Sequence, residues 1–298
     1  MTVVSVIVPF FDASATIGRC LESLVAQEMD PADYEIIAVD DGSTDDSAAI
    51  ARGFDRVRVL TADRGGAYAA RNRGVAVSRG PLLAFTDADC VARPDWLGRM
   101  VRAMEDPAAR VVTGRDRPAG RSRSVRLLAE YDHRKEELVL GGSDPAVYYA
   151  HTNNLITRRE LLDRVGGFEE RARGADVIFV HRVLALHGTD GVRYEPEALV
   201  DHLDIDSARA YFRKAFIYGR SGQRYAGIVD VAPLRARHRL EIFRRAIGAS
   251  GASPVPAAWL FALLSVGVVL YRVGWLWAAI GTSEGGRSDD AGRGTGEP

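Results

Sequence analysis

Three aspartates follow short apolar segments and are candidate ligands for a nucleotide and a metal ion. Asp87 and Asp89 come directly after the apolar run 82–85, and Asp41 follows the run 34–39. Because side chains alternate along an extended backbone, Asp87 and Asp89 are expected to point to the same side. Two acids can then divide the work, one on a ribose and one on Mg²⁺ or Mn²⁺, which keeps positions open for substrate phosphates.

Turn formation is the alternative explanation for the acids at positions 40 to 45. Asp and Ser side chains accept hydrogen bonds from free amides at a helix start, and Asp45 is placed to cap the segment that follows. Capping accounts for residues 43–45 but does not require acids at both 40 and 41. A carboxylate can accept the imide proton of uracil, which makes Asp41 a candidate ligand for a base.

The elements that must position these acids alternate between strand-like and helix-like segments over the first third of the chain. This order is typical of βαβ units with a parallel sheet buried on both faces. In such sheets, ligands bind at the carboxyl ends of the strands, where the three acids are expected. Strands are predicted at 3–9, 34–39, 56–60 and 82–86, and helices at 15–27, 46–53 and 65–77.

A second group of elements follows an arginine-rich segment. Residues 115–126 contain five arginines together with Ser, Pro and Gly, and this composition predicts a mobile loop. Its arginines could bind a phosphorylated acceptor, or could simply be solvated. Beyond it we expect strands at 148–156 and 193–200, and helices at 158–165, 176–187, 208–226 and 234–246.

The composition is that of an ordinary globular protein. The 298 residues are 47% hydrophobic and 27% charged, with a formal net charge of −1, so no general attraction to nucleic acid is expected. The two cysteines have no C-x-x-C spacing, which fits a reducing compartment. The chain starts directly in a strand-like run without a basic segment, so we expect no signal peptide and a cytoplasmic catalytic part.

Four motifs occur in a characteristic order. They are the first strand with Val8-Pro9-Phe10-Phe11, then Asp40-Asp41-Gly42-Ser43, Ala70-Arg71-Asn72-Arg73-Gly74 and Thr86-Asp87-Ala88-Asp89. In order and spacing the chain resembles the family 2 inverting glycosyltransferases, over roughly residues 3 to 205. The likeness includes Val165-Gly166-Gly167-Phe168. It implies a GT-A fold: an α/β, Rossmann-like, mixed but mainly parallel sheet flanked by helices.

The resemblance also implies a role for each matching residue on the donor side. Pro9 and Asp41 would line the nucleoside pocket, and Arg71 would lie near the ribose or the phosphates. Asp87 would contact the nucleoside side, and Asp89 would bind the Mg²⁺ or Mn²⁺ ion. The substrate would be a nucleotide-diphosphate sugar, and the acceptor hydroxyl would belong to a glycan or a lipid-linked molecule, as in the building of cell-envelope polysaccharides.

On the acceptor side the chain departs from the family. These enzymes place a Glu-Asp pair after the Gly-Gly-Phe segment, and the matching residues here are Ala175 and Asp176. The retained Asp176 is the predicted catalytic base, because a carboxylate near the acceptor hydroxyl can take its proton. Asp12 stands where the family usually has Asn, which is expected to alter hydrogen bonding near the base.

Two further residues receive roles from the resemblance alone. His202 would complete the metal shell or approach the diphosphate, although a partly exposed histidine at a helix start is an equal alternative. Arg220 lies where related enzymes place a basic segment over the diphosphate, and a solvated helix face explains it equally well.

The C-terminal region contains an apolar stretch of 25 residues, 256–280, long enough to cross a hydrocarbon core of roughly 30 Å. Five arginines between 235 and 245 precede it, so the positive-inside rule places the enzyme on the cytoplasmic face of the cell membrane. We therefore expect a donor-binding half (1–115), an acceptor-binding half (116–230), a basic and membrane-associated segment (231–281) and a disordered tail (282–298). A buried or interfacial helix pair is the alternative.

Two other functions fit parts of the pattern. A nucleotidyltransferase would need a glycine-rich phosphate loop that carries a lysine, and the only lysines are Lys135 and Lys214. A non-catalytic homologue that binds sugar nucleotides would explain the loss of the carboxylate at Ala175. Turnover on purified protein separates this second alternative from the enzyme.

Overall fold

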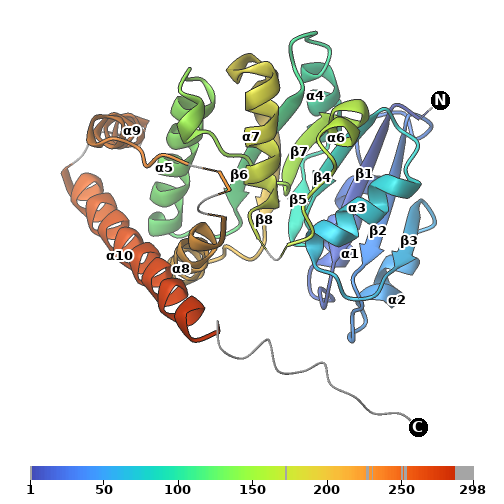
Figure 1. Ribbon diagram of the computed structural model, residues 1–298, viewed down its shortest axis with the longest axis horizontal. Coiled ribbons are helices and arrows are strands. Elements are labelled where there is room, and N and C mark those ends of the chain that lie inside the picture. Colours follow the sequence, from blue (N-terminus) through green and yellow to red (C-terminus); the bar gives the residue numbers. More distant parts are fainter. Residues whose placement is uncertain are drawn as a thin grey trace.

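The computed structural model describes residues 2–171, 173–225, 228–229, 231–249, 251 and 254–285. Within them, eight strands form one mixed sheet in the order β3-β2-β1-β4-β7-β6-β8-β5, flanked by helices (Figure 1). The strands are β1 (Val4–Phe10), β2 (Tyr34–Asp40), β3 (Val57–Thr61), β4 (Leu82–Thr86), β5 (Cys90–Ala92), β6 (Val111–Pro118), β7 (Asn154–Arg158) and β8 (Val192–His202).

The first half of the sheet is parallel, as the sequence predicts. β1 lies between β2 and β4 and runs parallel to both, and β2 pairs with β3. All seven residues of β1 are buried, because helices cover both faces of the sheet. The connections are α1 (Ile17–Val25), α2 (Ser47–Arg52) and α3 (Ala67–Val77), each within two residues of its predicted start.

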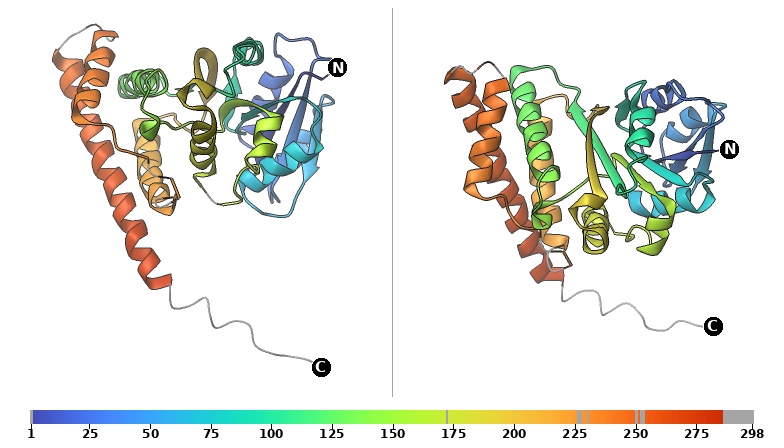
Figure 2. Two further views of the ribbon diagram at one scale, coloured as in Figure 1. Left: turned by 45° about the horizontal axis from the view of Figure 1, so that its top comes forward. Right: turned by 90° about the horizontal axis from the view of Figure 1, so that it is seen from above.

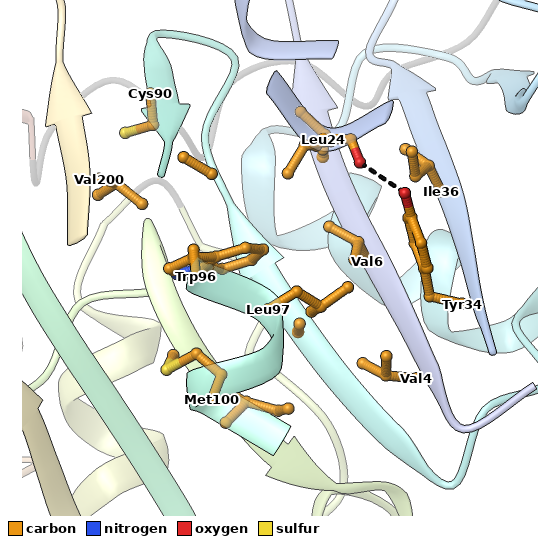
Figure 3. Packing of buried hydrophobic residues seen from close by; sticks show 14 of the residues in the cluster. Val4, Val6, Leu24, Tyr34, Ile36, Cys90, Trp96, Leu97, Met100 and Val200 are labelled. Atoms are coloured by element: carbon orange, nitrogen blue, oxygen red, sulfur yellow. Dashed lines mark hydrogen bonds between the residues drawn. The ribbon is translucent and has the colours of Figure 1, made fainter. Parts of the chain in front are cut away.

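Strand alternation divides the core between the two faces of the sheet. Val4, Val6 and Val8 pack with α1 and with α4 (Trp96–Ala103), where Trp96, Leu97 and Met100 are fully buried (Figure 3). Ile7 points to the opposite face and joins an aromatic cluster around Phe168. That cluster packs against α6 (Arg159–Arg164) and α7 (Ala175–His187).

The second half of the sheet corrects the prediction of a mobile loop at 115–126. β6 runs to Pro118 beside β8, with an irregularity between Gly114 and Arg115, and four residues separate its end from the start of α5 (Arg123–Leu140). Arg117 donates to both carboxylate oxygens of Asp201 across this pair, at 2.6 and 3.0 Å. The role of Arg117 could not be read from the local sequence, because its partner Asp201 lies 84 residues further along the chain. Two short 3₁₀ helices, Pro145–Val147 and Thr189–Gly191, complete this half.

Three helices follow the sheet: α8 (Ala208–Tyr225), α9 (Ala236–Ala249) and α10 (Pro254–Gly285). Together with α5 they form the edge of the molecule opposite β3 (Figure 2). The segment Pro254–Ile280 is long and apolar enough to cross a membrane, by length and composition alone. From residue 286 onward, the predicted disordered tail lies outside the described residues.

Candidate active site

The carboxyl ends of β1, β2 and β4 bring the predicted donor-side residues together. Pro9 and Phe10 end β1 opposite Val39 and Asp40 of β2, and Asp87 follows β4 directly. These strands are adjacent and parallel, so their ends share one edge of the sheet. The predicted cluster of acids is therefore present at this edge.

Asp41 is buried and holds the loop that opens α3. One carboxylate oxygen accepts the amide of Gly65 and the other the amide of Gly66, both at 2.8 Å. Gly66 has a φ of 89°, a conformation that side chains rarely allow. A carboxylate oxygen has a second lone pair, so Asp41 retains capacity to accept from a ligand.

The neighbouring acids fix the loops around this edge. Asp40 accepts from the amide of Ser43 at 2.8 Å, and Asp45 accepts from the amide of Ser47 at 3.0 Å. The N-cap of α2 is Asp46 rather than the predicted Asp45. Asp12, with a φ of 45°, accepts from the amide of Thr44 at 2.7 Å. Asp12 thus ties the β1–α1 loop to the β2–α2 loop.

Arg71 reaches Asp87 from α3 and forms an ion pair with its carboxylate. The arginine is buried, with its guanidinium 5.1 Å from the centre of the Tyr68 ring, whereas 36% of the Asp87 side chain is exposed. Arg71 Nε is buried without a hydrogen-bond partner among the described residues. An unpaired donor beside a partly exposed carboxylate can take a ribose hydroxyl or a phosphate oxygen.

The remaining residues of the Ala-Arg-Asn-Arg-Gly motif connect the two halves of the site. The Asn72 amide donates to the Phe168 carbonyl at 2.8 Å, and its oxygen accepts the Phe168 amide at 3.1 Å. Gly74 lies against β1, where an added Cβ would come within 2.6 Å of Ile7. The motif therefore binds the Gly-Gly-Phe segment, which precedes Asp176, to the donor half.

The prediction that Asp87 and Asp89 share one side of an extended chain is wrong, because residues 87–90 form a turn. The amide of Cys90 donates to the Asp87 carbonyl at 3.0 Å. The turn sends Asp87 toward Arg71 and places Asp89 Oδ2 3.4 Å from Nδ1 of His202 on β8. The two acids therefore have different neighbours.

Asp89 and His202 have the chemistry of a divalent-cation site. His202 is buried, and its Nδ1 has no hydrogen-bond partner among the described residues. Burial and the Lys214 ammonium lower the pKa of His202 to about 4, so the neutral imidazole can bind a metal. Burial and the charge of Asp87 raise the pKa of Asp89 to about 7. Burial also raises the pKa of the neighbouring Cys90 thiol, which therefore stays protonated.

Lys214 is a cation in the site that the sequence analysis did not assign. Its Nζ lies 2.5 Å from Nε2 of His202, on the side of α8 that faces the sheet. Arg220, the predicted diphosphate ligand, is exposed on the same helix and projects about 120° around the axis from Lys214. The only feature of the sequence that could have indicated Lys214 is that lysines are rare in this chain.

Asp176 lies in the first turn of α7, close to His151. Its Oδ2 is 3.6 Å from His151 Nδ1, and its Oδ1 accepts the Val177 amide at 2.9 Å. Burial raises the pKa of Asp176, but the hydrogen bonds and charge of His151, with Tyr68, outweigh it and hold the pKa below the ordinary value. Asp176 therefore stays ionised, as a proton acceptor must.

His151 and Asp116 extend the acceptor side beyond the residues that the sequence singled out. The His151 ring stacks on Tyr218 of α8, with centroids 5.9 Å apart. Asn153 donates to Asp116 Oδ2 at 2.6 Å, while Asp116 Oδ1 is buried without a partner in the described part of the chain. Ala175 is buried in the aromatic cluster, where a glutamate would not be solvated.

The sheet and its flanking helices define an α/β domain of the GT-A type. A mannosyltransferase from Pyrobaculum calidifontis, solved with GDP-Man and Mn²⁺, superposes with a TM-score of 0.59 at 21% identity, covering 94% of this chain and 84% of that one. TarS residues 1–349 of S. aureus, solved with UDP-GlcNAc, give a TM-score of 0.54 at 17% identity, covering 94% and 92%. These similarities support the fold.

The family is established by sequence. The profile of Glycosyl transferase family 2 matches residues 5–166, and the chain belongs to this family. Glycosyltransferase AglE of Haloferax volcanii is 32% identical over 188 residues, which are 60% of each chain. Succinoglycan biosynthesis protein ExoO of Rhizobium meliloti is 32% identical over 208 residues, 65% of this chain and 59% of that protein. The aligned part thus spans about 60% of the length of these relatives.

Proposed function

We propose that this protein is an inverting glycosyltransferase that moves a sugar from a nucleotide-diphosphate sugar to an acceptor hydroxyl. The observation that carries the proposal is the placement of two separate acids at one strand-end edge. Asp87 is paired with a buried arginine, and Asp89 faces a buried neutral histidine. Membership of glycosyl transferase family 2 supports the same reaction class.

On the donor side, Pro9 and Asp41 line the nucleoside pocket, while Arg71 and Asp87 bind the ribose or the α-phosphate. Asp89 and His202 hold Mg²⁺ or Mn²⁺, which when bound neutralises the charge that develops on the leaving diphosphate. Lys214 lies beside His202 and adds a second positive charge there. Arg220 remains a candidate for the outer diphosphate oxygens after a rearrangement of its side chain.

On the acceptor side, Asp176 accepts the proton of the attacking hydroxyl. The acceptor oxygen forms a bond to the anomeric carbon while the bond from that carbon to the diphosphate breaks, and the nucleoside diphosphate leaves with the electron pair. His151 faces Asp176 at 3.6 Å and keeps it ionised until this step. One displacement from the opposite side inverts the configuration at the anomeric carbon.

The proposal includes an organisation for the whole chain. Residues 1–115 bind the donor, residues 116–230 shape the acceptor site, and residues 231–281 attach the enzyme to the cytoplasmic face of the cell membrane. The acceptor is a glycan or a lipid-linked molecule, and no nucleic acid takes part. The length and hydropathy of Pro254–Ile280 support the membrane attachment.

A donor screen followed by a turnover assay tests the proposal. Sugar nucleotides are added with Mn²⁺, and the melting temperature is recorded, because a ligand at 100 times its Kd stabilises the fold by roughly 2.7 kcal/mol. The donor that binds is then incubated with glycan and lipid-linked acceptors, using Asp163→Asn as the surface control for Asp176→Asn. Binding without turnover for the wild type across the panel would favour a non-catalytic sugar-nucleotide-binding protein.

A further inference from the structure

The outer surface of α10 is an apolar face that is largely exposed in the described structure. Only 17% of its most apolar 18-residue window is buried, and Trp277 is 64% exposed. Arg272 is exposed between Tyr271 and Val273 and interrupts this surface, which is otherwise apolar. Apolar surface of this extent on a soluble protein marks an interaction site. The exposed large side chains are Val255, Trp259, Phe261, Val266, Val268, Val269, Tyr271, Val273, Trp275, Leu276, Trp277 and Ile280.

The inner side of α10 is packed against the catalytic domain at two places. Leu260 and Leu263 join a cluster with residues of α5 and α9 near the start of the helix. Further along, an added Cβ at Gly274 would lie 2.2 Å from the Phe216 carbonyl oxygen, and one at Gly219 would lie 2.0 Å from that of Tyr271. The backbones of α8 and α10 therefore touch at a glycine on each helix.

These contacts leave no free stretch for a membrane span. Leu260 and Gly274 are separated by about 21 Å along the helix axis, at 1.5 Å per residue. Six residues precede Leu260 in α10, and six follow Gly274 up to and including Ile280, whereas a span needs about 20 residues surrounded by lipid. A helix that crossed the bilayer in this arrangement would draw α8 in with it.

The charges of α8 oppose such an insertion. Arg209, Arg213 and Arg220 are exposed along one side of α8, next to the side that contacts α10. An arginine at the centre of a bilayer is strongly disfavoured, and three would be carried in together. The helix therefore meets lipid with its outer side only.

Basic residues surround the start of this apolar face. Arg123 lines a groove of about 620 Å³ with Val255, Ala258 and Trp259, and the Trp259 indole donates to Ser124 Oγ at 3.0 Å. A second groove of about 330 Å³ is lined by Arg123 and Arg126 together with one acid, Glu130. Five more arginines, all exposed, lie on or just before α9: Arg235, Arg237, Arg239, Arg244 and Arg245. Indole and guanidinium groups are suited to the headgroup region, where lipid phosphates lie.

We propose that α10 lies in the plane of the membrane, with its outer side in the acyl boundary and Arg123 and Arg126 on the phosphates of anionic phospholipids. This inference rests on the membrane attachment in the proposed function, and it replaces a crossing helix with one that binds a single leaflet. The amphipathic unit is α10 together with α8 and α5, because these two helices supply the polar side that α10 lacks. α8 also joins the two regions, since Phe216 faces α10 and Lys214 faces the active site.

Vesicle flotation tests the lipid contact with the full chain. We expect wild-type protein to float with phosphatidylcholine vesicles that contain 30% phosphatidylglycerol, and at least fivefold less with pure phosphatidylcholine. Arg123→Gln/Arg126→Gln should lose this preference, whereas Arg19→Gln/Arg102→Gln on α1 and α4 should keep it. Phe261→Ser/Val269→Ser/Trp277→Ser should lose flotation, and Leu186→Ser, an exposed control on α7, should retain it. If the wild type forms a stable dimer in lipid-free buffer and does not float with vesicles, the apolar face contacts a second copy of the chain and the proposal is overturned.

Topology in cells tests the orientation. Epitope tags are added at both ends of the chain, and a protease is added outside intact spheroplasts of a bacterial host. We expect both tags to be protected there and both to be digested in inverted membrane vesicles. Digestion of the C-terminal tag alone in spheroplasts would show that α10 crosses the membrane. Sugar-nucleotide binding measured on the same preparations separates a failure of this inference from a failure of the proposed enzymatic function.

Discussion

The contact between α8 and α10 predicts opposite outcomes for the same substitution at two glycines of one helix. At Gly274 an added methyl group would lie 2.2 Å from the Phe216 carbonyl oxygen, well inside the 3.0 Å below which Cβ contacts essentially never occur. At Gly267 nothing lies within 4 Å of the added Cβ. Gly267→Ala is therefore a matched control for Gly274→Ala, in the same helix and with the same change of side chain.

The expected magnitudes follow from two opposing effects. Alanine in a helix interior is about 1 kcal/mol more favourable than glycine, and only this gain applies at Gly267. At Gly274 the backbone of α8 must move away, and overpacking of this kind costs about 1 to 3 kcal/mol. Gly274→Ala should therefore be less stable than Gly267→Ala by about 1 to 3 kcal/mol, or roughly 2 to 8 °C in melting temperature for a domain of this size.

The assay is thermal unfolding of both variants in the same mild detergent, together with donor binding. Because α8 also carries Lys214, Gly274→Ala should weaken donor binding, whereas Gly267→Ala should leave it unchanged. Gly219→Ala, whose Cβ would lie 2.0 Å from the Tyr271 carbonyl oxygen, should behave like Gly274→Ala. Equal melting temperatures for the two α10 variants would refute the packing of α10 on α8.

Three other predictions concern titratable side chains: Glu136, Asp176 together with His151, and Lys214. Burial and the charge of Asp116 raise the pKa of Glu136 to about 8, so the folded state holds a proton that the unfolded chain has lost above about pH 4.5. The free energy of unfolding should therefore fall as pH rises from about 5 to 8, by roughly 1.4 kcal/mol for each unit of pKa shift. Glu136→Gln should flatten this fall, as measured by melting curves at several pH values. Equal pH dependence of stability in the wild type and the variant would contradict the prediction. Asp176→Asn should lower kcat by about 10²-fold to 10⁴-fold with donor affinity unchanged. His151→Gln should move the acid limb of the pH–rate profile to higher pH, because His151 holds the pKa of Asp176 down. Lys214→Met should raise the KM for the donor by roughly tenfold while Lys135→Met leaves donor KM unchanged, and an unchanged KM in Lys214→Met would remove Lys214 from the donor site.

The donor half was predictable because its signals are local. Each acid follows its strand within three residues, and parallel strands bring their ends to a common edge. The sequence could not show that the oxygens of Asp41 hold Gly65 and Gly66, because that contact depends on how the loop before α3 folds back. The turn at 87–90 was also missed, since an extended chain was assumed.

The acceptor half depends on contacts between distant segments. Lys214 comes to His202 from the next helix, and His151 comes to Asp176 across 25 positions of sequence. The arginines at 115–126 looked like a loop because Asp201, which pairs with Arg117, lies 84 residues away. Hydropathy correctly predicted a long apolar helix near the C-terminus, but it could not show that α8 would cover one side of it.

The most direct test of the central claim is metal-dependent transfer by wild type and Asp89→Asn. Purified protein is incubated with the donor found by screening and with an acceptor, in Mn²⁺ and in EDTA, and the glycosylated product is measured by mass spectrometry. Asp95→Asn, at the start of α4, is the control for a lost carboxylate. We predict product only with the metal, a loss of at least about 10²-fold in Asp89→Asn and no loss in Asp95→Asn. Undiminished transfer in EDTA, or by Asp89→Asn, would contradict the account.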